Sequence, residues 1–240
     1  MRIKITRLLS GIMPDSLRFL LRKLGLNKVI NKLINKSEGE IIFQSNWANK
    51  FKVNRDKVLE YWQKYLYLRE IKKICQLRSH TKVLDIGCGI SSILHFIKGK
   101  RFGIDPLADE YLKMYKYPPG ISITRGVGEK LPFPNRFFDV IFCTNVLDHT
   151  DNPREVVKEI SRVLKKRGYF ILAVHIFNKS FKRDPAHPHT FTGKGVYSLI
   201  SGRFKPVFQK ISPAIGFYDY VSKGVRKSKN KELVLILKML

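Results

Sequence analysis

The sequence predicts an α/β fold in which helices cover both faces of a mostly parallel β-sheet. Short apolar runs alternate with helix-like segments from residue 81 onward, and the first run leads into Asp85 and a loop with two glycines, Gly87 and Gly89. Strands separated by helices are typical of βαβ units, whose parallel strands need cover on both faces. The 240 residues, 44% of them hydrophobic, are enough for one sizeable core.

Residues 1–55 differ from the rest and are predicted to form a basic amphipathic extension ahead of a domain at 56–240. Residues 1–36 carry nine Lys and Arg residues against one acid, Asp15. Leucines recur there at helical spacing, at Leu17, Leu20, Leu21 and Leu24. The apolar face of such a helix packs on the domain, or it lies on an anionic membrane surface or a partner.

A helix is predicted over residues 56–76, with a thick aromatic side. Trp47, Tyr61 and Tyr65 are candidates for a lid over a ligand, but an aromatic stripe at helical spacing is more typical of a core.

The alternating part predicts the remaining elements in chain order. Strands are expected at 82–86, 101–105, 121–125, 138–146 and 169–174, with helices at 90–99, 108–115 and 152–166, the last ended by Gly168. A helix at 192–202 then precedes two closing strands, 205–211 and 232–240, which a basic loop at 222–231 separates.

The glycine loop after the first strand is the main candidate for ligand binding. Ligands of open α/β sheets sit beyond the carboxyl ends of the strands, and glycine lets the backbone turn tightly there. The start of the next helix, near Ile90, would offer unpaired amides. Asp105 ends the second strand, where a carboxylate can accept the hydroxyls of a ribose.

A dinucleotide enzyme shares part of this pattern, but two details count against it. Ser92 stands where the dinucleotide fingerprint has its third glycine. Asp85 precedes the loop, and its charge would repel a pyrophosphate and attract an ammonium group. The loop therefore favours a positively charged nucleoside over a dinucleotide.

Three stretches together resemble the class I S-adenosylmethionine-dependent methyltransferases, in their small-molecule-type branch. They are "VLDIGCG", "GID" and "GVGEKLPFPNRFFDVIFCTNVLDHTDNPREVVKEISRVLKKRGYFILAV", within residues 80–176. The resemblance implies a Rossmann-like, seven-stranded sheet with one antiparallel strand near its edge. It also implies S-adenosylmethionine as the cofactor.

The resemblance carries nine cofactor-binding positions onto this chain. Asp85 would bind the ammonium group, and Gly87, Cys88 and Gly89 would lie beneath the methionine part of the cofactor. Asp105 would bind the ribose hydroxyls, and Pro106 and Gly128–Glu129 would lie beside the adenine. The carbonyl of Asn145 would close the methionine pocket. The alternative for Asp105 is an ordinary turn acid before proline. The chain departs from the family pattern at Ser91 and at Val127, where the family often has an acid that meets the adenine.

Five residues near strand ends are candidates for a general base: Asp148, His149, His175, His187 and His189. The alternative for His149 is a cap of the turn before helix 152–166, and the alternative for His187 and His189 is a solvated loop. His187 and His189 have no evident third ligand, so no metal site is predicted.

The sequence thus predicts a methyltransferase acting on a small-molecule, glycan or lipid-linked acceptor. The net charge of +27 leaves open an RNA methyltransferase or RNA-binding protein, although "TNVLDH" lacks the Asn/Asp-Pro-Pro-aromatic turn that amino-methylating base enzymes have. A non-catalytic scaffold is a third alternative, because Val127 replaces the adenine-binding acid.

Cysteine content and hydropathy bear on location. The three cysteines form no close pair, which fits a reducing compartment, and no apolar run reaches the roughly 18 residues of a membrane-spanning helix. A cytoplasmic protein is expected, with peripheral contact to anionic membranes through residues 1–36.

Overall fold

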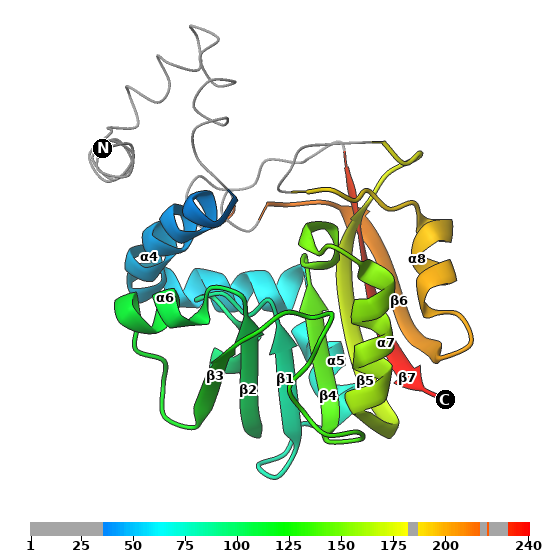
Figure 1. Cartoon of the computed structure of the whole chain (residues 1–240), viewed down its shortest axis with the longest axis horizontal. Coiled ribbons are helices and arrows are strands. Elements are labelled where there is room, and N and C mark those ends of the chain that lie inside the picture. The colour runs from blue at the N-terminus through cyan, green and yellow to red at the C-terminus, as the bar shows by residue number, and fades with distance from the viewer. Residues whose placement is uncertain (1–35, 182–186, 217–219, 221–229) are drawn as a thin grey trace, which may run out of the picture.

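A seven-stranded sheet with the order β3-β2-β1-β4-β5-β7-β6 forms the centre of the molecule in the computed structural model (Figure 1). Residues 36–181, 187–216, 220 and 230–240 are described. The strands are β1 (Lys82–Ile86), β2 (Lys100–Asp105), β3 (Ile121–Arg125), β4 (Phe138–Thr144), β5 (Leu164–Ile176), β6 (Phe204–Pro213) and β7 (Lys231–Met239).

The strand pairing confirms the Rossmann-like, mostly parallel sheet. β1 to β5 run parallel to one another, whereas β7 is antiparallel to both β5 and β6. The one reversed strand therefore lies next to the edge, as the family resemblance implied. The strand order reverses between β1 and β4, which is the position where open α/β sheets bind ligands.

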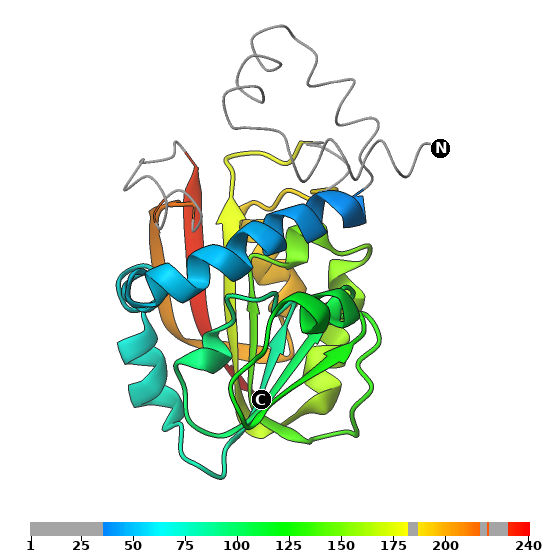
Figure 2. The ribbon, with the colours of Figure 1, turned by 90° about the vertical axis from the view of Figure 1, so that its left-hand side faces the viewer.

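Helices cover both faces of this sheet, as Figures 1 and 2 show. Helices α4 (Lys36–Lys64) and α5 (Leu68–Cys75) lie on one face, and α7 (Pro153–Val163) and α8 (Gly193–Ile200) lie on the other. Helix α6 (Ala108–Met114) follows β2, and the 3-10 turns η1 (Ile93–His95) and η2 (Leu147–His149) follow β1 and β4.

The core has two layers, because successive side chains of a strand point to opposite faces. Val83 of β1 joins Trp47 and Trp62 of α4 in one buried cluster. Leu84, the next residue, joins Val156 and the rest of the α7 side in the other. This alternation explains why the central strands β1 and β4 are mostly apolar on both faces.

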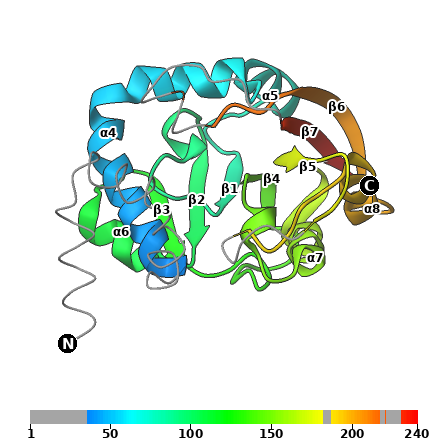
Figure 3. The same ribbon diagram turned by 90° about the horizontal axis from the view of Figure 1, so that it is seen from above.

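Helix α4 differs from the predicted helix at 56–76 at both ends. It begins at Lys36, is interrupted at Asn54 (φ −118°, ψ 27°) and ends at Lys64, and Figure 3 shows its two halves at an angle. Tyr67 then adopts a left-handed conformation (φ 55°), and α5 begins at Leu68. Apolar side chains on several sides of this segment could not all be buried by one straight helix, so the break lets α5 turn onto the sheet.

The predicted helix at 90–99 is wrong, because only the turn η1 forms there. Ile90, Ile93, Leu94 and Ile97 have helical spacing, but all four are buried, and so is His95. The segment therefore has no solvent-facing side. The His95 ring bonds the Ile90 carbonyl oxygen (2.8 Å) in place of a regular helical ladder.

The remaining predicted elements occur within a few residues of their expected bounds. Helix α7 ends at Val163 rather than at Gly168, which lies inside β5. The predicted arm at 1–36, except for its last residue, and most of the basic loop at 222–231 lie outside the described residues. Within the described ranges, no helix combines the length and apolar character needed to span a membrane.

Candidate functional site

A cavity of about 730 Å³ opens at the carboxyl ends of β1, β2 and β4. It lies at the point where the strand order reverses, and α4 contributes part of its wall. All nine predicted cofactor-binding residues line it: Asp85, Gly87, Cys88, Gly89, Asp105, Pro106, Gly128, Glu129 and Asn145.

The glycine loop has no room for side chains at two positions. Gly87 (φ 65°) and Gly89 (φ 48°) both adopt left-handed conformations that favour glycine. A Cβ atom at Gly87 would lie 2.4 Å from Val146 Cγ2, and one at Gly89 would lie 2.8 Å from Gln44 Nε2. The Gly87 amide donates to the Ile104 carbonyl oxygen (2.8 Å), which fixes the loop against β2.

Two buried carboxyl groups lie beneath this loop. Asp85 accepts a hydrogen bond of 2.6 Å from the Ser92 hydroxyl. Asp105 accepts bonds from the Gly89 amide (3.2 Å) and the Leu107 amide (2.9 Å). Each carboxyl therefore has fixed partners within the protein and also faces the cavity.

Burial raises the pKa values of both carboxyls. The pKa of Asp85 rises to about 7, with a further increase from the charge of Asp105. The pKa of Asp105 rises to about 6, mainly through burial and also through Glu40, although its bonds to the two amides act in the opposite direction. A cationic ligand would favour the ionised forms, so the site suits a positively charged group.

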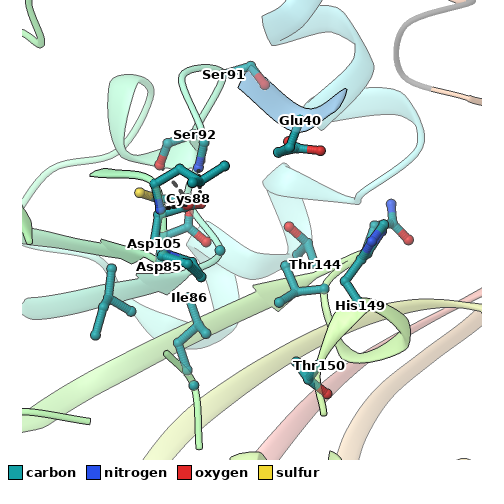
Figure 4. A pocket seen from close by; sticks show the side chains of 18 of the residues that line it. Glu40, Asp85, Ile86, Cys88, Ser91, Ser92, Asp105, Thr144, His149 and Thr150 are labelled. Atoms are coloured by element: carbon teal, nitrogen blue, oxygen red, sulfur yellow. Dashed lines mark hydrogen bonds between the residues drawn. The ribbon is translucent and has the colours of Figure 1, made fainter. Parts of the chain in front are cut away.

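Helix α4 supplies two polar residues that the sequence analysis missed. Gln44 Oε1 accepts a hydrogen bond from the Ile90 amide (3.0 Å), and its Nε2 donates to Glu40 Oε1 (2.8 Å). The predicted free amide at Ile90 is thus occupied by a side chain, which corrects the expectation of an open helix terminus. Figure 4 shows Glu40 projecting from α4 toward the cavity. Polar residues four apart on a helix resemble a surface face, so no sequence signal marked them.

Two buried polar atoms of the cavity wall have no hydrogen-bond partner among the described residues. They are Asn145 Oδ1, an acceptor, and Trp62 Nε1, a donor. Asn145 itself is held in place, because its amide donates to the Ala173 carbonyl oxygen (2.8 Å) and its Nδ2 donates to Glu232 Oε1 (3.1 Å). Such atoms are costly to bury unless a ligand pairs with them. With Asp85 and Asp105 they fit a ligand that carries an ammonium group and hydroxyls.

The predicted adenine segment also borders the cavity. Val127, 43% exposed, lines it beside Gly128 and Glu129. Glu129 Oε1 accepts bonds from the amides of Asp151 (2.9 Å) and Asn152 (3.2 Å). Its side chain therefore holds the loop that leads into α7.

The predicted catalytic residues gather on the side of the cavity away from the glycine loop. His149 and His187 line the cavity with ring centroids 4.3 Å apart, and Figure 4 shows His149 across from Asp85 and Asp105. Asp148 is buried outside the lining, with its Oδ1 3.9 Å from His149 Nε2.

The other two candidate histidines, His175 and His189, lie near this group. His189 does not line the cavity, and its Nε2 is 3.3 Å from the Asp151 carbonyl oxygen. His175, at the end of β5, does line it. We call His149, His175 and His187 the histidine end of the cavity.

Comparison with known proteins identifies the domain. Residues 84–172 match the family described as methyltransferase domain. An uncharacterised methyltransferase of Bacillus subtilis, YcgJ, is 33% identical over 134 residues, 48% of this chain and 53% of that protein. The YcgJ crystal structure matches with a TM-score of 0.53 at 19% identity and covers 72% of this chain and 97% of that one. Residues 84–172 therefore match a methyltransferase domain, and the fold is that of the class I S-adenosylmethionine-dependent methyltransferases. The cofactor of the domain is therefore S-adenosylmethionine, and its class of reaction is methyl transfer.

Other relatives of this methyltransferase differ in their named substrates. An uncharacterised protein of Methanocaldococcus jannaschii is 29% identical over 82% of this chain and 96% of that protein. A sarcosine/dimethylglycine N-methyltransferase of Aphanothece halophytica is 30% identical over 43% of each chain. A tRNA U34 carboxymethyltransferase of Campylobacter lari is 29% identical over 51% of this chain and 45% of that protein. The methyltransferase thus spans about half the length of several curated relatives that it matches.

Proposed function

We propose that this methyltransferase transfers a methyl group to a small-molecule, glycan or lipid-linked acceptor bound at the histidine end of its cavity. The observation that carries the proposal is that one cavity joins the glycine loop to His149, His175 and His187. Its volume of about 730 Å³ lies within the range of small-molecule sites, about 300–1,000 Å³. That volume suits a cofactor together with the reacting part of one small acceptor.

S-adenosylmethionine supplies, when bound, a methyl group activated by attachment to a positively charged sulfur. The residues of this chain that would hold it are those beneath the glycine loop, with Asp85 for the ammonium group and Asp105 for the ribose hydroxyls. Asn145 Oδ1 offers a further acceptor. Their contribution is to bind and align the reactants and to exclude water from the cavity.

The predicted catalytic residues have different access to this cavity. His149 and His187 line the cavity and can reach an acceptor, whereas Asp148 and His189 do not line it, and Asp148 Oδ1 lies 3.9 Å from His149 Nε2. For a hydroxyl acceptor, an imidazole here that is not bound to a metal ion would take up the proton. These roles are predictions from the family resemblance and from the placement of the rings.

The experiment has two stages. Purified protein is first titrated with S-adenosylmethionine by calorimetry. It is then incubated with labelled-methyl cofactor and separate extracts of lipids, glycans, small metabolites and RNA. The proposal expects saturable binding and label in one of the first three extracts. Absence of cofactor binding, or label in RNA alone, would contradict it.

A second candidate is methylation of RNA, which the net charge of +27 and the tRNA-modifying relative favour. Cationic contacts to phosphates release counterions, so affinity for RNA would fall steeply as salt rises. Filter binding to tRNA, measured between about 50 and 200 mM salt, distinguishes RNA methylation from methylation of a small acceptor. The affinity of a protein for phosphates changes strongly over this range. A tight, salt-steep complex that accepts label supports the RNA candidate.

A further inference from the structure

We propose that Asp148, His149 and His187 form a binding site for one divalent transition-metal ion at the histidine end of the cavity. The role of this ion rests on the proposed function, because the ion would bind an oxygen of the acceptor. Binding of the ion does not depend on the proposed methyl transfer and can be measured separately.

The three residues offer one carboxylate and two imidazoles at close range. One ligand atom from each lies within 4.8 Å of those of the other two. His149 Nε2 and Asp148 Oδ1 are 3.9 Å apart. Ligands about 2.1 Å from a tetrahedral ion lie roughly 3.4 Å from one another, so small side-chain rotations would close the set.

The fold, rather than the sequence spacing, brings this set together. Asp148 and His149 belong to η2, which follows β4, whereas His187 belongs to the connection between β5 and α8. The His189 amide donates to the Asp148 carbonyl oxygen (3.4 Å), which ties the two segments together. The sequence predicted no metal site because only His187 and His189 could be paired from their spacing. The structure supplies Asp148 and His149 in place of His189.

The same connection is also fixed to the end of the sheet. The Phe177 amide donates to the Phe191 carbonyl oxygen (2.8 Å), and Ile176 forms a bridge with Phe191. His187 therefore approaches η2 from a segment that is anchored just past His189.

The placement of the set resembles that of a catalytic metal site rather than a closed structural one. His149 and His187 are half-buried and line the cavity, whereas Asp148 is buried behind them. An ion held by these three ligands would keep open positions facing the cavity, which is typical of catalytic sites. Two imidazoles with one carboxylate suit zinc, iron, cobalt or nickel better than magnesium or calcium.

An open coordination position on the ion, close to the bound methyl donor, could activate the acceptor. A hydroxyl oxygen of the acceptor bound there would lose its proton at a lower pH, because the ion stabilises the resulting negative charge. The O–H bond breaks, the proton passes to solvent, and the electron pair stays on the oxygen. The site thus points to an acceptor with a hydroxyl group.

The test is cobalt binding to full-length protein that has been treated with a chelator and dialysed. Co²⁺ is added while its visible absorption is followed, and Zn²⁺ is then used to displace it. We expect one Co²⁺ per chain in the wild type. We expect affinity to fall by more than about tenfold in Asp148→Asn and in His187→Ala, because a ligand is lost.

Two histidine variants serve as controls. His80→Ala removes an exposed imidazole away from the cavity, and His189→Ala removes the neighbour of His187 that points to Asp151. Both should bind Co²⁺ like the wild type. S-adenosylmethionine titration of each variant checks that its fold is intact, and His187→Ala carries the test if Asp148→Asn fails to fold.

The outcomes separate this proposal from the proposed function. Lack of Co²⁺ binding by the wild type, or equal binding by His187→Ala, would overturn the site. Equal methyl transfer by chelated and metal-loaded protein would overturn the role of the ion. Protein that binds Co²⁺ but transfers no methyl group to any extract would overturn the proposed function and leave the metal site supported.

Discussion

At the scale of single residues, Gly87 is expected to tolerate substitution least. Alanine there would combine an unfavourable left-handed conformation with a contact of 2.4 Å to Val146. We expect Gly87→Ala to abolish S-adenosylmethionine binding in calorimetry. Gly202→Ala is the matched control, because Gly202 also has a positive φ (73°) but nothing within 4 Å of its Cβ position. Equal cofactor affinity in the two variants would place the cofactor away from the glycine loop.

Asp105 is expected to contribute to affinity through its charge. Asp105→Asn keeps the size of the side chain and one acceptor oxygen, but it loses the charged hydrogen bonds to a ribose. The affinity for S-adenosylmethionine should fall about ten- to a hundredfold, the usual value of hydrogen bonds to a charged group. Asp109→Asn, on the exposed side of α6, should leave it unchanged. An unaltered isotherm for Asp105→Asn would remove this residue from the site.

The buried carboxyls predict how stability depends on pH. Burial raises the pKa of Asp85 to about 7, of Glu232 to about 7 and of Asp105 to about 6. The folded state then binds more protons than the unfolded state, so stability is lost as pH rises through these values. Burial lowers the pKa of His95 to about 4, an effect that acts mainly below pH 6.5.

The free energy of unfolding should therefore fall between about pH 6.5 and pH 8 by about 1 to 2 kcal/mol. Urea denaturation at the two pH values measures this change. Glu232→Gln and Asp85→Asn should each reduce the dependence, because each removes one titrating group. A wild-type stability that rises over this range would show that the carboxyls are ionised in the folded protein.

At the scale of elements, helix α4 is expected to support the glycine loop. Gln44→Ala removes the acceptor of the Ile90 amide and a contact with the loop. Cofactor affinity should fall about fivefold, which corresponds to about 1 kcal/mol for one hydrogen bond. Gln63→Ala lies on the exposed side of the same helix and should have no effect. If both variants bind alike, α4 does not influence the loop.

The strands could be predicted well and the helices less well, for a physical reason. A buried parallel strand such as β4 is apolar along its length, and few other structures accommodate that pattern. Residues 90–97 have the spacing of a helix, but the surrounding core buries all sides of the segment. The spacing of apolar residues within a segment does not reveal which of its sides a distant element will bury. Helix α4 is such a distant element.

The same distinction holds for the site. The positions of Asp85, Gly87 and Asp105 at the cavity could be predicted, because they depend on strand ends and on the backbone of one loop. Glu40 and Gln44 could not, because they reach the cavity through the packing of a distant helix. The proximity of Asp148 and His187 likewise depends on how two separate connections meet.

At the scale of the whole molecule, the chain has a net charge of +27, whereas the cavity contains the buried acids Asp85 and Asp105. We predict that the basic residues at 1–36 attract an anionic membrane surface. Removing residues 1–35 should reduce sedimentation with phosphatidylserine vesicles at low salt and leave S-adenosylmethionine affinity unchanged. Undiminished sedimentation would show that residues outside 1–35 bind the vesicles. Loss of cofactor affinity would show that residues 1–35 pack against the domain.

Strand β7 has a consequence for the synthesis of the protein. It lies between β5 and β6, yet it follows every other strand in chain order, and Leu233–Leu237 are almost fully buried. While translation proceeds, β5 keeps an open edge until residues 231–239 emerge from the ribosome. Open strand edges invite pairing between nascent copies. The chain is therefore most exposed to such pairing before β7 takes its place beside β5.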